Sequence, residues 1–128
     1  MPRVLVVDDD PAVLQVLTAG LEKEQLEVRA AADIDASREL LQSEPFDVIL
    51  TDLFVRAFSP GGFTPLDAYR EVAPDVPIMV LTAHTQAERL DPMHFGLAAI
   101  IAKPVVLSDL VARLRAVLAS RDGNPTAG

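Results

Sequence analysis

The sequence predicts an α/β fold in which a parallel β-sheet carries helices on both faces. Short apolar runs rich in Val, Ile and Leu alternate five times with stretches of helical periodicity, which is the pattern of repeated βαβ units. The chain has 128 residues, half of them hydrophobic, so it can build one core of ordinary domain size. We therefore expect one domain over residues 1–120 and a flexible tail, or the start of a linker, over residues 121–128.

The first strand is predicted at Val4–Val7, because this apolar run stops abruptly at three aspartates, as in a strand that is buried on both faces. The next helix begins at Pro11, with Asp10 as its N-cap, and keeps an apolar face to about Lys23. Leu26–Ala31 is the second predicted strand.

The second helix opens at Asp33 or Asp35 and must stop before Pro45, because the residue that precedes a proline disfavours helical backbone. Residues 46–51 then form a third, nearly continuous apolar strand. This strand delivers Asp52 at its C-terminal end.

The second half of the chain repeats the pattern around a loop at residues 54–64, which contains Ser-Pro-Gly-Gly. A helix over residues 65–72 precedes the fourth strand, residues 77–81, which ends at Thr82. Residues 86–90 favour a further helix, but Pro92 interrupts it, so we expect this helix to be irregular or partly unwound. The fifth strand, residues 98–102, leads to Lys103, and Ser108 is predicted to cap the last helix.

The composition excludes several classes of function. The chain has no cysteine, which removes disulfides, thiolate catalysis and cysteine-ligated metals. Its net charge of −8 repels phosphate backbones and anionic membrane surfaces. No apolar stretch approaches the roughly 20 residues that span a bilayer, and the N-terminus does not resemble a signal peptide. We expect a cytoplasmic protein that binds neither nucleic acid nor membrane directly.

Chemistry-bearing side chains follow the strands at one edge of the predicted sheet. The first strand ends in three aspartates, and Asp52, Thr82 and Lys103 end three others. Ligands of open parallel sheets bind at this edge. Crowded carboxylates repel one another unless a cation lies between them, and Mg²⁺ prefers such oxygen ligands and often shares its shell with phosphate. The sequence therefore predicts a divalent ion, with Asp52 as a nucleophile that forms an acyl phosphate and Lys103 as a partner of the phosphoryl oxygens.

In this order and spacing, Asp8, Asp9, Asp52, Thr82 and the pair Lys103-Pro104 resemble the receiver domain of two-component response regulators. The likeness extends over about residues 3–120. It implies a flavodoxin-like fold with strand order 2-1-3-4-5. It also implies a phosphorelay switch rather than an enzyme: a sensor histidine kinase or phosphotransfer protein phosphorylates Asp52, and a downstream output domain or protein responds.

The resemblance also assigns roles within the site. The implied ligands of Mg²⁺ are Asp9, Asp52, the backbone carbonyl of Phe54 and, through a water, Asp8. Thr82 would shift to hydrogen-bond the phosphoryl group, and Lys103 would pair with it. The chain would thereby assist its own phosphorylation and dephosphorylation. The peptide bond between Lys103 and Pro104 is usually cis in such domains.

The chain departs from the family pattern at three places. Ile100 occupies a position that usually holds an aromatic residue, so the usual coupling from phosphate to the fourth-helix surface is expected to be altered. The loop after Asp52 has Arg56 and Pro60 where Pro and Gly are common, and its next helix starts late. Phe54 is bulky enough to screen an attacking water, which predicts a long-lived phosphorylated state.

Two alternatives stay open at this point. One is a receiver that binds partners without phosphorylation. The other is a haloacid-dehalogenase-like phosphatase, with Asp8 as nucleophile and Asp10 as acid–base group. Against the phosphatase, Ala12 stands where Thr or Val is usual, and no second acidic pair follows Lys103. The sequence does not reveal the cognate kinase, the output or whether the chain forms a homodimer.

Overall fold

A computed structural model describes residues 1–52, 65–82 and 96–127. Five parallel strands form one sheet in the order β2-β1-β3-β4-β5, which confirms the order that the resemblance implied. The strands are β1 (Arg3–Val7), β2 (Glu27–Ala31), β3 (Val48–Asp52), β4 (Ile78–Thr82) and β5 (Ala99–Ala102). The helices are α1 (Pro11–Glu22), α2 (Ile34–Ser43), α3 (Pro65–Val72) and α4 (Leu107–Ala127).

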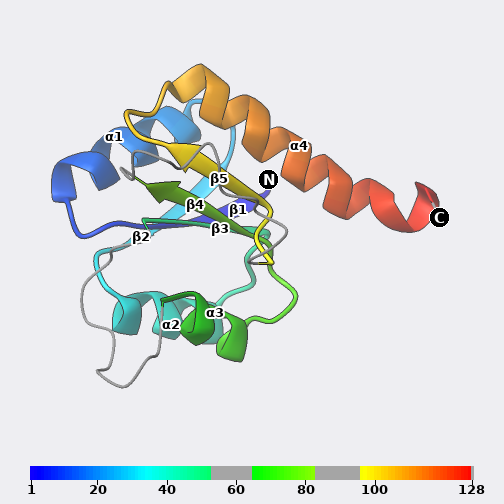
Figure 1. The fold of residues 1–128 in the computed structure, drawn as a ribbon, viewed down its shortest axis with the longest axis horizontal. Coiled ribbons are helices and arrows are strands. Elements are labelled where there is room, and N and C mark those ends of the chain that lie inside the picture. The colour runs from blue at the N-terminus through cyan, green and yellow to red at the C-terminus, as the bar shows by residue number, and fades with distance from the viewer. Residues whose placement is uncertain (53–64, 83–95, 128) are drawn as a thin grey trace.

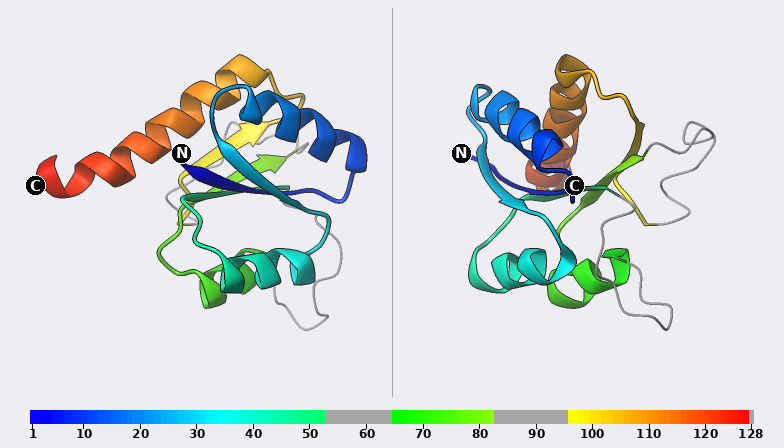
Figure 2. Two further views of the ribbon diagram at one scale, coloured as in Figure 1. Left: turned by 180° about the vertical axis from the view of Figure 1, so that it is seen from behind. Right: turned by 90° about the vertical axis from the view of Figure 1, so that its left-hand side faces the viewer.

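The helices cover the sheet on both faces, α1 and α4 on one and α2 and α3 on the other (Figures 1 and 2). Strand β1 shows how the sequence produces this arrangement. Val4 and Val6 belong to the core on the α1–α4 side, whereas Leu5 and Val7 belong to the core on the α2–α3 side. Because both faces of the strand are buried, its sequence is continuously apolar instead of alternating.

Two predicted caps hold their helices as expected. The side chain of Asp10 accepts a hydrogen bond from the backbone N–H of Ala12 at 2.9 Å, at the start of α1. Asp33, not Asp35, is the N-cap of α2, and its side chain accepts from the N–H of Ala36 at 2.8 Å. These bonds satisfy amide groups that have no partner within their own helix.

The start of α4 differs from the prediction. The helix begins at Leu107, and the carbonyl of Val106 accepts its first intrahelical bond, from the N–H of Leu110 at 3.0 Å. Val106 therefore occupies the N-cap position, and Ser108 lies inside the helix without capping it. Leu107 also lies against α1 at Gly20, where a β-carbon would overlap the leucine side chain.

Helix α4 continues to Ala127 and extends beyond the sheet (Figure 1). The flexible tail or linker start expected over residues 121–128 stays a prediction. The predicted loop at 54–64 and the irregular helix around Pro92 lie outside the described residues. Within the described ranges, no helix has the length and apolarity needed to cross a membrane.

Candidate functional site

The carboxyl ends of the strands bring the predicted site residues together. Val7 and Thr51 are register partners in neighbouring strands, so the residues that follow them, Asp8 and Asp52, emerge side by side. Asp8, Asp9 and Asp52 each offer a carboxylate oxygen, and these oxygens all lie within 4.8 Å of one another. The sheet thus builds the acidic cluster that the sequence predicted, from residues more than forty positions apart.

Lys103 reaches this cluster from the end of β5. Its Nζ lies 2.9 Å from Oδ2 of Asp52 and 3.3 Å from Oδ2 of Asp8. The Asp8 side chain is only 3% exposed and that of Asp52 12%. The ammonium group therefore bridges two buried carboxylates, and its contacts are screened by water less than those of a surface pair.

The pKa of Lys103 reflects two opposing effects. Burial, the largest single influence, favours the neutral amine and lowers the pKa. The hydrogen bond and charge of Asp52, followed by those of Asp8, together outweigh burial and raise the pKa above its ordinary value. Lys103 therefore keeps its positive charge at neutral pH.

The cluster has an excess of negative charge. Among the described residues that form it, three carboxylates face one ammonium group. Mg²⁺ binds oxygens at about 2.0–2.1 Å, so opposite ligands in its octahedron lie roughly 4.2 Å apart. The carboxylate oxygens of the cluster lie at most 4.8 Å apart, so they need to move only slightly closer together to reach this distance. The donor set therefore fits a hard divalent cation in both charge and dimension.

Asp8 is held more firmly than a surface aspartate. Its Oδ1 accepts the backbone N–H of Asp10 at 2.9 Å, while its Oδ2 faces Lys103. Both oxygens thus already have a protein partner, which suits a carboxylate that reaches a cation through water. Asp10 takes no part in the cluster and caps α1, as the sequence predicted.

Thr82 ends β4 beside this site. Thr82 is wholly buried. Its backbone carbonyl accepts a hydrogen bond from the N–H of Lys103 at 2.8 Å, and this bond connects the ends of β4 and β5. The peptide bond between Lys103 and Pro104 is cis, as the resemblance implied. The predicted contribution of Phe54, both as a ligand and as a screen against water, lies outside the described residues and stays a prediction.

Sequence reasoning missed two hydroxyl groups beneath Asp52. The hydroxyl of Thr51 donates to the backbone carbonyl of Asp52 at 3.0 Å, and the Tyr69 hydroxyl lies 3.2 Å from Thr51 Oγ1. Both residues are wholly buried. The available signal was a threonine within an otherwise apolar strand. It did not identify Tyr69, because that contact depends on how α3 lies against the sheet.

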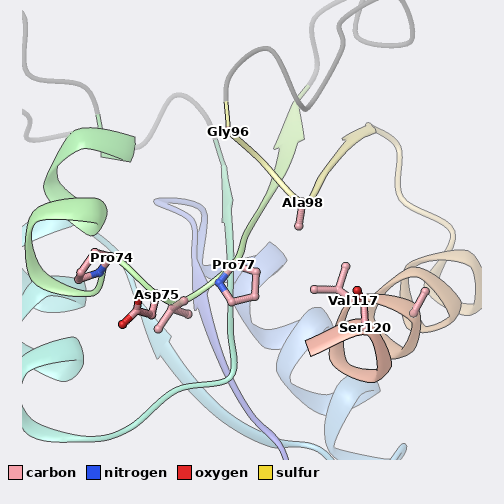
Figure 3. Close-up of a pocket in the computed structure, with 9 residues that line it drawn as sticks. Pro74, Asp75, Pro77, Gly96, Ala98, Val117 and Ser120 are labelled. Carbon is pink, nitrogen blue, oxygen red and sulfur yellow. The ribbon is translucent and has the colours of Figure 1, made fainter. Parts of the chain in front are cut away.

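The opposite end of the sheet holds a surface hollow of about 720 Å³. It lies between the turn before β4, the start of β5 and the side of α4 (Figure 3). Pro77 and Ala98, which line it, directly precede the two strands, so the hollow opens at their amino ends. It is therefore separate from the acidic cluster.

Comparison with known proteins identifies the class. The family model of the response regulator receiver domain matches residues 4–115. The chain therefore belongs to the receiver domains of response regulators, which are signalling switches. This membership supports the receiver interpretation over the phosphatase alternative.

Individual relatives agree with the family match. The transcriptional regulatory protein PrrA of Mycobacterium tuberculosis is 37% identical over 127 residues, which cover 98% of this chain and 53% of PrrA. The DNA-binding dual master transcriptional regulator RpaA of Synechocystis is 33% identical, over 99% of this chain and 53% of RpaA. The chain thus spans about half the length of these relatives.

Solved structures show the same fold. The non-phosphorylated receiver domain of HemR from Leptospira biflexa is 31% identical, with a TM-score of 0.76 over 93% of this chain and 95% of that one. A CheY-like receiver domain from Methanospirillum hungatei has a TM-score of 0.83 at 24% identity, over 97% of this chain and 98% of that one. At that identity, the second likeness concerns the fold alone.

Proposed function

We propose that Asp52 accepts a phosphoryl group in a Mg²⁺-dependent reaction, from a sensor histidine kinase or a phosphotransfer protein. The observation that carries this proposal is the contact of 2.9 Å between Lys103 Nζ and Asp52 Oδ2, within a cluster of three carboxylates. Among the described residues, Lys103 supplies one positive charge beside the three carboxylates. A divalent cation adds positive charge to this group and makes the approach of a phosphoryl group possible.

Asp9 and Asp52 are the proposed direct ligands of Mg²⁺, together with the backbone carbonyl of Phe54, and Asp8 is the proposed ligand through water. When bound, the ion supplies positive charge beside the phosphoryl oxygens, which lowers the repulsion between phosphate and carboxylate. The engagement of both Asp8 oxygens supports its more remote role.

In the proposed transfer, a lone pair on a carboxylate oxygen of Asp52 forms the new O–P bond. The P–N bond to the donor histidine breaks, and its electron pair stays on the imidazole nitrogen. Lys103 already lies at Asp52, so its ammonium group can pair with a phosphoryl oxygen after a small movement. Thr82 is proposed to donate its hydroxyl hydrogen to another phosphoryl oxygen.

The proposed donor must cover the edge of the sheet that carries Asp52. Next to this edge, an apolar hollow of about 350 Å³ lies between α1 and the segment after β5. Val13 and Leu17 line one side, and Lys103 and Val105 line the other. Val16, which is 65% exposed, borders it. We propose that the kinase or phosphotransfer protein contacts this hollow while its phosphohistidine reaches Asp52.

An output domain or protein is proposed to read the phosphorylated state, since the matched relatives are transcriptional regulators about twice as long as this chain. A cytoplasmic location belongs to the same proposal. The acidic net charge favours protein partners over direct contact of this domain with nucleic acid or membrane.

A second candidate function is a receiver that acts as an interaction module without phosphorylation. Ile100 favours it, because this aliphatic side chain packs partly buried against the core on the α2–α3 side. It offers neither a ring nor a hydroxyl that could report on the state of the site. This candidate predicts Mg²⁺ binding without uptake of phosphate.

Intact-mass measurement after treatment with acetyl phosphate and Mg²⁺ tests the proposal. The wild-type chain should gain one phosphoryl group, and Asp52→Asn should gain none, because an amide is not a nucleophile here. Omitting Mg²⁺ should abolish the gain. A wild-type chain that binds Mg²⁺ but stays unmodified would favour the interaction module instead.

A further inference from the structure

Thr51 stands out within a row of side chains that crosses the sheet. The strand register aligns five residues in this row, which are Ala31, Val7, Thr51, Val80 and Ile100. The other four are apolar and belong to, or pack against, the core beneath α2 and α3. Valine has nearly the same shape as threonine, so filling this space does not require a hydroxyl group.

Tyr69 supplies the partner that this hydroxyl needs. Its side chain comes from α3, is wholly buried and places its hydroxyl 3.2 Å from Thr51 Oγ1. Thr51 has one hydroxyl hydrogen and donates it to the carbonyl of Asp52. The Tyr69 hydroxyl is then the donor to Thr51. The bonds therefore run in one direction, from α3 through β3 to the main chain of the proposed phosphoryl acceptor.

The tyrosine keeps the proton that this chain of bonds needs. Burial raises the pKa of Tyr69 and outweighs the influence of the neighbouring hydroxyl groups of Thr51 and Ser37, which lower it. Ser37 is itself wholly buried in α2, where its hydroxyl donates to the carbonyl of Asp33 at 2.6 Å. The Tyr69 hydroxyl thus lies where α2, α3 and β3 meet.

Two hydroxyl groups in an apolar core cost free energy unless they are paired, and phenylalanine and valine would fill the same space without that cost. Their pairing ends on Asp52 and not on a remote group. We propose that Tyr69 and Thr51 are positioning residues, which hold the main chain of Asp52 for phosphoryl transfer and link the state of this residue to α2 and α3. This inference rests on the proposed function of Asp52.

The chemical test compares the rates at which full-length variants take up the phosphoryl group from acetyl phosphate with Mg²⁺. Tyr69→Phe and Thr51→Val should each slow uptake about two- to tenfold, the range expected for one lost hydrogen bond. The double variant should be no slower than the slower single variant, because both changes break the same chain of bonds. Thr51→Ser retains the hydroxyl and should restore most of the rate.

A matched control separates positioning from stability. Ile78→Val removes one methylene group from the same core, at the other end of the sheet. It should lower the midpoint of urea unfolding without slowing uptake at a temperature where all variants are folded. If Ile78→Val slowed uptake as much as Tyr69→Phe did, the effect would be one of stability, and the inference would be wrong.

Tyr69 also offers a spectroscopic test, because the sequence contains no other tyrosine and no tryptophan. Its fluorescence in the wild-type chain should change when acetyl phosphate is added with Mg²⁺. The Asp52→Asn variant should show no such change on the addition of acetyl phosphate. A phosphorylated wild-type chain with unchanged tyrosine emission would overturn the proposed link to α3.

The two proposals fail in different ways. A wild-type chain that takes up no phosphoryl group overturns the proposed function, and this inference with it. A wild-type chain that is modified at Asp52 at the same rate as Tyr69→Phe and Thr51→Val leaves the proposed function intact and overturns the inference alone.

Discussion

The two ends of the sheet carry charged groups in different ways. At the amino ends, Arg3 and Arg29 pair with Glu27 and Glu44 at 2.8–3.8 Å in partly exposed positions. At the carboxyl ends, three carboxylates face Lys103, and two of the carboxylates are nearly buried. Partly exposed pairs of opposite charge are screened by water, whereas nearly buried carboxylates that lie close together repel one another more strongly and favour a bound cation. This difference supports the proposed site independently of family resemblance.

The largest expected effect on stability follows removal of the cation at the carboxyl end. Lys103→Met would leave Asp8 and Asp52 buried without their ammonium partner. We expect the free energy of unfolding in the absence of Mg²⁺ to fall by about 1–2 kcal/mol, less than for a fully buried pair because Lys103 is 25% exposed. Urea unfolding measures the change. An unchanged unfolding midpoint would mean that the charge imbalance is screened by water.

Added Mg²⁺ should stabilise the wild-type chain, because the ion binds a site that only the folded state assembles. At a free concentration ten times its dissociation constant, the gain is about 1.4 kcal/mol, and thermal unfolding with and without the ion measures it. Asp9→Asn should lose most of this gain. Asp10→Asn is the matched control, since Asp10 caps α1 outside the cluster and asparagine also caps helices. Equal losses in both variants would contradict the proposed ligands.

The raised pKa of Lys103 predicts a dependence of stability on alkaline pH. A folded-state pKa above the unfolded value means that the pairing contributes fully below the ordinary value of 10.5. The contribution is then lost as the pH rises through the folded pKa. Urea unfolding across this range should show wild type and Lys103→Met converging. A gap between them that stays constant would be evidence against the pairing.

The smallest effect is expected at the amino end. Arg3→Met removes contacts to Glu27 and Glu44, but these groups are exposed to water and screened by salt. Stability should change little, the change should shrink further in high salt, and phosphoryl uptake should stay at the wild-type rate. A large loss of uptake in Arg3→Met would show that the two ends of the sheet are coupled.

The sequence predicts those parts of the fold and of the site that depend on local signals or on general rules for parallel sheets. The apolar run of β1 and the caps at Asp10 and Asp33 are local signals, and the structure confirms them. The convergence of Asp8, Asp52 and Lys103 followed from the general rule that parallel strands place their carboxyl ends at one edge. The order of the strands came from the family resemblance, because strand–helix alternation is compatible with several orders.

Other features depended on how elements lie against one another. The contact between Tyr69 and Thr51 requires a particular placement of α3 over the sheet, which periodicity does not provide. At the start of α4, Ser108 resembled a cap, but the helix begins at Leu107, two residues earlier than a cap at Ser108 would give, and propensity does not resolve boundaries that closely.

Gly20 lies outside the site but touches the helix that follows it. Leu107 at the first turn of α4 lies against this glycine, and only residues 103–106 separate β5 from that turn. A β-carbon at position 20 would overlap the end of the Leu107 side chain, so this side chain would have to move. A substitution at Gly20 therefore acts first on the packing between α1 and α4.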